Sequence, residues 1–206
     1  MKNYKNLFFA VIMIAAASFT ANAQIRLGAG INTGVALGEE LSDWSSFGIG
    51  GGVSGEYMLT DNISAGLSVG FVSFAGKTET VSITVPDPNN PFGPLITQDQ
   101  DVEYPATSII PIQLLGNYHF MPDEDFNFYA GLGLGLGLVS PDIEGIDAAT
   151  GFAITPRIGA NYMFSDELGL DFNLGYSILN ATFDGAEEAS DFSYLPINVG
   201  IVYILD

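Results

Sequence analysis

The stretch DFNFYAGLGLGLGLV, residues 125–139, alternates large apolar residues with small or polar ones along almost its whole length. Its phenylalanines and leucines fall on one face of a strand, and the other face includes four successive glycines, Gly131, Gly133, Gly135 and Gly137. Successive side chains of a β-strand point to opposite sides, so one side of this strand must contact an apolar medium. The pattern is typical of a strand in a β-barrel that crosses a lipid bilayer.

The same alternation recurs seven more times. We expect strands over about residues 24–37, 47–59, 63–71, 108–120, 125–139, 152–164, 168–178 and 195–205. Three connections between them are short, at 60–62, 121–125 and 165–167, and alternate with four longer ones at 38–46, 77–106, 140–149 and 184–191. With an even number of strands, both termini and all short turns lie at one end. The chain is therefore predicted to be all-β, an eight-stranded antiparallel up-and-down transmembrane β-barrel with periplasmic termini.

A soluble eight-stranded barrel, as in the lipocalins, also alternates, but its polar face is turned outward. Such a face should be rich in charged residues. The only charged residues on the polar face of the predicted strands are Arg26, Glu56, Arg157 and Asp171. We therefore expect this face to line a narrow lumen and the apolar face to contact lipid. Aromatic residues near the strand ends predict two interfacial girdles.

The N-terminus has the features of an export signal. Lys2 and Lys5 precede an apolar run, and Ala21-Asn22-Ala23 forms a small-x-small cleavage site. The apolar run is short for a membrane anchor, which is the alternative. We therefore expect residues 1–23 to be a cleaved signal peptide and residues 24–206 to be the barrel domain.

Charge and composition exclude several functions. After removal of residues 1–23, three basic residues stand against 24 acidic ones, a formal charge of −21. Nucleic-acid binding requires a basic surface, so nucleic acid is not an expected partner. The chain has no cysteine, which excludes disulfides and thiolate chemistry.

Three segments resemble the small eight-stranded porin-like outer-membrane barrels, in the form common in Bacteroidetes-type bacteria. They are residues 111–120, PIQLLGNYHF, residues 128–135, FYAGLGLG, and residues 156–164, PRIGANYMF. The resemblance spans the mature chain and implies a β-barrel in the Gram-negative outer membrane. It also implies lipid and the barrel-assembly machinery as partners. Barrels of this family usually end on an aromatic residue, whereas this chain ends Tyr203-Ile204-Leu205-Asp206.

Eight residues of the polar face are candidates for a polar network inside the lumen, with a structural role or, alternatively, a conducting one. They are Arg26, Glu56, Gln113, Asn117, Tyr129, Arg157, Asn161 and Asp171. Buried charges need partners, so a network that fills the lumen is favoured over an ion path. We expect Arg26 to pair with Glu56 on the adjacent strand.

Two cross-strand neighbours follow from the short turns. Folding about residues 165–167 predicts Asn161 opposite Asp171. Folding about residues 121–125 predicts Asn117 opposite Tyr129.

Neither catalysis nor metal binding is predicted. His119, the only histidine, has no apparent Ser-His-acid set around it in the sequence, so we expect no catalytic residues. Acidic residues cluster in all four long connections, but none has the DxDxDG spacing of a calcium loop. We expect no cofactor and no metal site.

The sequence thus predicts a monomeric outer-membrane barrel with a filled lumen and a structural or surface-interaction role through acidic external loops. A binding partner outside the cell would contact these loops. The proline-containing connection 77–106 is predicted to be either such a contact site or an irregular cap over the barrel mouth. The alternative function is a narrow porin-like channel for small polar solutes.

Overall fold

The computed structural model describes residues 24–86, 93, 95–186 and 188–205. The predicted signal peptide, residues 1–23, lies outside the described residues. The elements in chain order are β1 (Ile25–Ala36), α2 (Glu39–Trp44), β2 (Ser45–Thr60), β3 (Ile63–Gly76), β4 (Thr78–Val85), β5 (Ile96–Glu103), β6 (Thr107–His119), β7 (Phe126–Pro141), β8 (Ala149–Met163), β9 (Leu168–Gly175), β10 (Ile178–Thr182), β11 (Ser190–Asp191) and β12 (Tyr194–Leu205).

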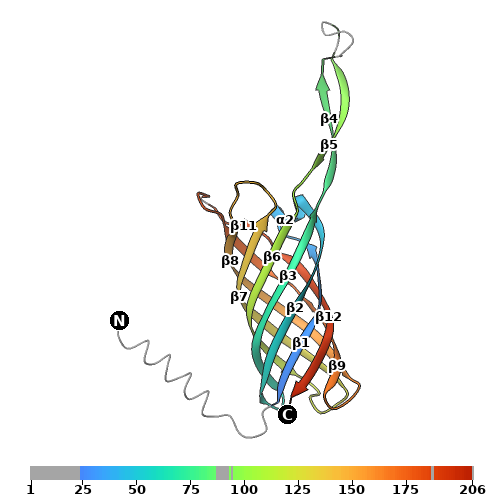
Figure 1. Ribbon diagram of the computed structural model, residues 1–206, viewed down its shortest axis with the longest axis vertical. Helices are drawn as coiled ribbons and strands as arrows, with labels where there is room; N and C mark the ends of the chain where they lie inside the picture. The colour runs from blue at the N-terminus through green and yellow to red at the C-terminus, as the bar shows by residue number, and fades with distance from the viewer. Residues whose placement is uncertain (1–23, 87–92, 94, 187, 206) are drawn as a thin grey trace, which may run out of the picture.

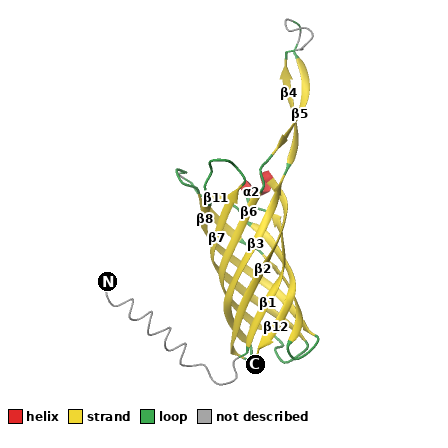
Figure 2. Cartoon of the chain, in the orientation of Figure 1, coloured by secondary structure: helices red, strands yellow, loops and turns green. Residues whose placement is uncertain are grey.

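Eight strands form a closed antiparallel barrel, shown in Figures 1 and 2. Around the ring they follow the order β1, β2, β3, β6, β7, β8, β9 and β12. The first and last strands close the ring through a continuous register from Ile25↔Leu205 to Ala36↔Tyr194. The predicted eight-stranded up-and-down barrel is thus confirmed.

The seventh predicted strand is divided into β9 and β10. The register on β8 continues across the division, from Arg157↔Gly175 to Ile154↔Ile178. Between them, the Tyr176 N–H donates to the Pro156 carbonyl over 3.0 Å, but proline has no N–H with which to return a bond. The division therefore reflects a missing hydrogen bond, and β9 and β10 together follow β8 as one continuous strand.

The apolar face of the strands points outward. Leu114, Ile158 and Val53 are each at least 60% exposed, and many other aliphatic residues between the aromatic ends of the strands are more than one third exposed. Polar side chains at the alternate positions, such as Gln113 and Asn161, are buried inside. This arrangement matches a barrel surrounded by lipid and not a soluble one. No helix in the described part of the chain is long and apolar enough to span a membrane.

Glycine pairs allow two of the strands to approach closely inside the barrel. Gly30 on β1 pairs with Gly200 on β12, and a Cβ on Gly30 would lie 2.6 Å from the Gly200 Cα. No larger residue fits there without a shift of the backbone.

The connection 77–106 is not an irregular cap. It contains β4 and β5, which pair from Thr78↔Glu103 to Val85↔Ile96 and rise away from the barrel (Figure 1). Polar and apolar residues alternate along much of residues 78–85, as in a β-strand. The prolines of the same connection had favoured an irregular structure instead. Pro88, Pro91, Phe92 and Pro94 lie outside the described residues.

An apolar cluster fills the lumen at the end that carries the hairpin. Its fully buried members include Phe74, Ile109, Val139 and Leu179, and Leu41 of α2 packs with them. The sequence predicted a polar filling, which describes only the other half of the lumen. Part of the difference arises because β3 continues beyond Phe71, where the predicted strand ended, and turns Val72 and Phe74 inward. Ile109 and Val139 lie within the predicted strands, at inward positions near the same end of the barrel.

Candidate functional site: the polar lumen

The half of the lumen nearer the termini contains two guanidinium groups and two carboxylates, so its formal charges balance. An ion pair joins the Arg157 Nη2 and Glu56 Oε1 atoms at 3.2 Å, with side chains 12% and 14% exposed. Arg157 lies on β8 and Glu56 on β2, four strands apart around an eight-strand ring. The Arg157 side chain therefore bridges the lumen from one wall to the opposite one.

Asn117 on β6 holds this bridge in place. Its Oδ1 accepts hydrogen bonds from Arg157 Nε at 3.1 Å and from Arg157 Nη2 at 2.9 Å. Its Nδ2 donates to Glu56 Oε2 over 2.7 Å. The Arg157 guanidinium also lies 5.6 Å from the centre of the Tyr129 ring, within the range of a cation–π contact. One arginine is thus fixed by three residues from three strands.

Asp171 on β9 is the centre of a second group. Its Oδ1 accepts hydrogen bonds from Asn161 Nδ2 at 2.5 Å and from the Tyr129 hydroxyl at 2.9 Å. Its Oδ2 accepts from Asn173 Nδ2 at 2.8 Å. Arg26 Nη2 donates to Asn161 Oδ1, so that asparagine connects the second arginine to the carboxylate. A buried carboxylate with three donors is well compensated for its lost hydration.

His119 belongs to a third group that resembles a catalytic triad only in composition. Its Nδ1 faces Asn127 Nδ2, a donor, at 2.9 Å, so the ring proton lies on Nε2. Nε2 then donates to the Ser64 Oγ at 3.1 Å, and Ser64 donates to Glu56 Oε2 over 2.7 Å. In this order the histidine cannot remove the serine proton, and Ser64 is fully buried. The group forms a hydrogen-bonded chain and does not activate a nucleophile.

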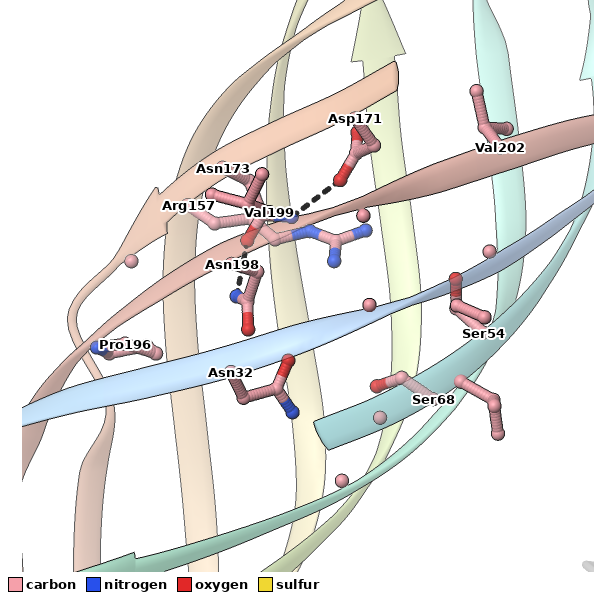
Figure 3. A pocket seen from close by; sticks show the side chains of 18 of the residues that line it. Asn32, Ser54, Ser68, Arg157, Asp171, Asn173, Pro196, Asn198, Val199 and Val202 are labelled. Atoms are coloured by element: carbon pink, nitrogen blue, oxygen red, sulfur yellow. Dashed lines mark hydrogen bonds between the residues drawn. The ribbon is translucent and has the colours of Figure 1, made fainter. Parts of the chain in front are cut away.

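A cavity of about 140 Å³ lies beside these groups. It has room for a few water molecules, since water takes about 30 Å³ each in the liquid. Figure 3 shows Arg157 extending into it, with Asn32, Ser54 and Ser68 among the residues around it. The wall formed by β1, β2, β3 and β12 carries small residues, namely Gly28, Gly30, Gly52, Gly70 and Gly200. Arg26 and Glu56 also come from this wall, whereas Gln113, Tyr129 and Arg157 come from the opposite one.

The structure places all eight sequence-predicted lumen residues inside the barrel, and their structural or conducting role stays a prediction. Gln113 donates to the Thr155 Oγ1 over 2.7 Å and lines the same cavity as the two charged groups. The predicted pairing of Asn161 with Asp171 is confirmed by the register. Arg26 and Glu56 are also register partners, but the Glu56 ion pair is with Arg157.

The predicted pairing of Asn117 with Tyr129 is wrong. Tyr129 pairs with His119, and Asn117 pairs with Gly131. The turn is shifted by one residue from the assumed centre, because the Asn127 side chain accepts from the Met121 N–H and the Phe120 N–H bonds to the Phe128 carbonyl.

Sequence reasoning also missed several members of the network. They are Ser64, His119, Asn127, Thr155, Asn173 and Asn198. All occupy the polar face of a predicted strand or its extension, and that shared position is the signal that could have identified them. Within the described residues, no group of three or more acidic or histidine side chains could hold a metal ion.

The sequence matches the profile of the outer membrane protein β-barrel domain over residues 7–204. No curated protein matches the chain significantly. Among solved structures, OprG of Pseudomonas aeruginosa is 13% identical with a TM-score of 0.58, covering 91% of this chain and 98% of OprG. Neisserial surface protein A is 14% identical with a TM-score of 0.57, covering 88% and 96%. Ail of Yersinia pestis is 9% identical with a TM-score of 0.53, covering 89% and 99%. These likenesses concern the fold. The profile match covers nearly the whole chain, which therefore belongs to the outer membrane protein β-barrel domain family.

Proposed function

We propose that this protein is a non-conducting outer-membrane barrel that presents its acidic loops and the β4–β5 hairpin to the cell exterior for interaction with other molecules. The termini and short turns then lie in the periplasm. The observation that carries the proposal is the apolar cluster that fills the lumen beneath the hairpin.

This cluster is a poor path for ions or polar solutes. Phe74 and Tyr194 pack edge to face with ring centres 5.5 Å apart, and both are buried. Ala153 and Leu179 are nearly inaccessible at the same end of the lumen. An apolar constriction excludes water, and an ion would lose its hydration there without a polar partner. The Arg157 bridge adds a second obstruction in the other half.

The long connections support the proposed orientation. Outer-membrane barrels have short periplasmic turns and longer external loops. The acidic residues of the long connections include Glu39, Glu40, Asp142, Glu144 and Asp184. Charged side chains at an exposed rim keep it hydrated and available for contact. The likeness to a Neisserial surface protein and to an attachment invasion locus protein fits this role but shows the fold alone.

A narrow channel is the second candidate, and the glycine-lined cavity favours it. If the apolar cluster moved aside, the cavity beside Arg157 would join the two ends of the barrel. This candidate predicts conductance that depends on Arg157.

Single-channel recording in a planar bilayer tests the proposal. We expect refolded protein, residues 24–206, to be silent, with its altered gel mobility on heating showing that the barrel has folded. The double variant Phe74→Ala/Leu179→Ala should open the lumen, whereas Ile49→Ala/Leu67→Ala on the lipid-facing side should stay silent. Steady openings of the unaltered protein that change with Arg157→Ala would overturn the proposal in favour of the channel.

Surface labelling tests the orientation. An epitope inserted between residues 89 and 90 should bind antibody on intact cells. An epitope after Asp206 should bind only after the outer membrane is permeabilised. The opposite pattern would contradict the proposed topology.

A further inference from the structure

The β4–β5 hairpin is a two-stranded sheet of its own, separate from the barrel sheet among the described residues. Figures 1 and 2 show it standing clear of the barrel end. Eight residues per strand, at about 3.3 Å each, make it roughly 26 Å long. All eight residues of β5 are exposed. An isolated two-stranded ribbon presents unpaired N–H and C=O groups along both edges, and such an edge can accept another strand.

The two faces of the hairpin differ sharply. On one face β5 presents Asp99, Asp101 and Glu103 at alternate positions. The Thr80 hydroxyl donates to Asp101 Oδ1 over 2.7 Å, and the Ser82 hydroxyl donates to Asp99 Oδ1 over 2.6 Å. These bonds orient the carboxylates, and each carboxylate can still accept at its other oxygen.

The other face is largely apolar. Val81, Ile83 and Val85 of β4 lie there with Ile96 and Val102 of β5, and the polar residues of this face are Glu79, Gln98 and Gln100. Val81, Ile96 and Val102 are between 38% and 42% exposed, and no other described element covers them. A two-stranded ribbon is only marginally stable alone in water, so a third strand added at its edge, which would widen this face, would stabilise it.

The charge around the hairpin selects the kind of partner. No basic residue occurs between Thr78 and Glu103. Lys77, the one lysine near the base of the hairpin, already donates to the Ser42 carbonyl. A second copy of this chain would bring like charges together, because β5 would meet another acidic strand. The complementary partner is cationic.

We propose that the free edge of β5 binds an extended, cationic segment of a partner polypeptide as a third strand. Lysine or arginine at every second position would lie beside Asp99, Asp101 and Glu103. Apolar residues at the intervening positions would lie on the other face, next to the side chains of Ile96 and Val102. The alternation follows from the geometry, because neighbouring side chains of an added strand point to opposite faces. This inference rests on the proposed surface role and names the class of partner.

The probe is a synthetic ten-residue peptide of alternating lysine and valine. It is titrated into refolded protein, residues 24–206, in nanodiscs of zwitterionic phosphatidylcholine, and binding is followed by the fluorescence anisotropy of a label on the peptide. The variant Asp99→Asn/Asp101→Asn/Glu103→Gln should weaken binding at least tenfold. The matched variant Asp142→Asn/Glu144→Gln/Asp147→Asn removes the same charge from another connection at the same barrel end and should change binding less than twofold.

Two further measurements separate strand addition from general attraction between charges. A peptide of the same composition with five lysines followed by five valines should bind at least tenfold more weakly than the alternating peptide. Because the chain has no cysteine, single cysteines can be introduced without background reaction. With oxidised glutathione as the oxidant, a peptide carrying one central cysteine should form a disulfide faster with Gln100→Cys on β5 than with Val81→Cys, its cross-strand partner on β4.

Equal losses in the two triple variants, equal affinity for the two peptides, or no binding of the alternating peptide would each overturn the inference. None of these results bears on the silent bilayer or the surface labelling, so the proposed function can stand when this inference fails. Conductance by the unaltered protein, in contrast, would overturn the proposed function, and the peptide titration would still decide whether the hairpin binds a cationic strand.

Discussion

Replacing Arg157 with methionine should destabilise the barrel substantially. The change removes the ion pair to Glu56 at 3.2 Å and the two hydrogen bonds to Asn117 at 2.9 and 3.1 Å. Removing one partner of a buried ion pair costs about 3–5 kcal/mol, because the other charge is left without compensation. Glu56 keeps its bonds from Ser64 and Asn117, so we expect a loss near the lower value, about 3 kcal/mol.

A double-mutant cycle isolates the interaction. Glu56→Gln alone should also cost about 3 kcal/mol, because it leaves the Arg157 charge without its counter-charge, although the amide oxygen can still accept a hydrogen bond. The variant Glu56→Gln/Arg157→Met leaves neither charge behind, so its cost should fall short of the summed single costs by about 1–3 kcal/mol. The assay is urea unfolding in phosphatidylcholine vesicles, with the folded fraction read from gel mobility without heating.

Glu167→Gln is the control. Glu167 accepts a hydrogen bond from the Tyr203 hydroxyl at 2.9 Å at an exposed site, where a substitution should change the free energy of unfolding by less than about 0.5 kcal/mol. A loss below about 1 kcal/mol for Arg157→Met, or strict additivity in the cycle, would refute the view that the bridge across the lumen stabilises the barrel.

Three other substitutions test the packing, each by the same unfolding assay. Phe74→Ala removes a fully buried ring from the apolar cluster and should cost about 3–5 kcal/mol; a loss below about 1 kcal/mol would mean that the cluster is loosely packed. A Cβ on Gly50 would lie 1.8 Å from the Phe71 carbonyl oxygen, whereas one on Gly116 would meet nothing within 4 Å. Gly50→Ala should therefore cost about 1–3 kcal/mol and Gly116→Ala almost nothing, and equal effects would contradict this register. Leu114→Arg places a charge on the lipid-facing side, where Leu114 is 65% exposed, and should cost about 2–4 kcal/mol; a neutral result would argue against lipid contact there.

The barrel could be predicted because its signal is local. The alternation of residues such as Leu134 and Gly135 shows which side chains share a face of a strand, and this can be predicted without knowing the neighbouring strands. The scarcity of charge on the polar face then indicated which face is inside. The hairpin was missed because the prolines of its connection outweighed the alternation of residues 78–85.

The contacts of the lumen depend on features that a strand pattern does not contain. Asn161 and Asp171 could be paired because a three-residue turn leaves little freedom in the register. Asn117 and Tyr129 could not, because side-chain hydrogen bonds of Asn127 shift the next turn by one residue. A shift of one residue in the turn moves every cross-strand pair that follows it.

The sequence by itself therefore determined the number of strands, their faces and the side of the barrel on which the connections are long, because each of these follows from period-two alternation along the chain. Only the tertiary structure decided that Arg157 meets Glu56, 101 residues away. That contact requires ring closure, which brings β8 opposite β2 across the lumen. Ring closure also brings Phe74 and Leu179 together in the apolar cluster inside the barrel. The pairing of β4 with β5 over eight residues extends this hairpin beyond the barrel end.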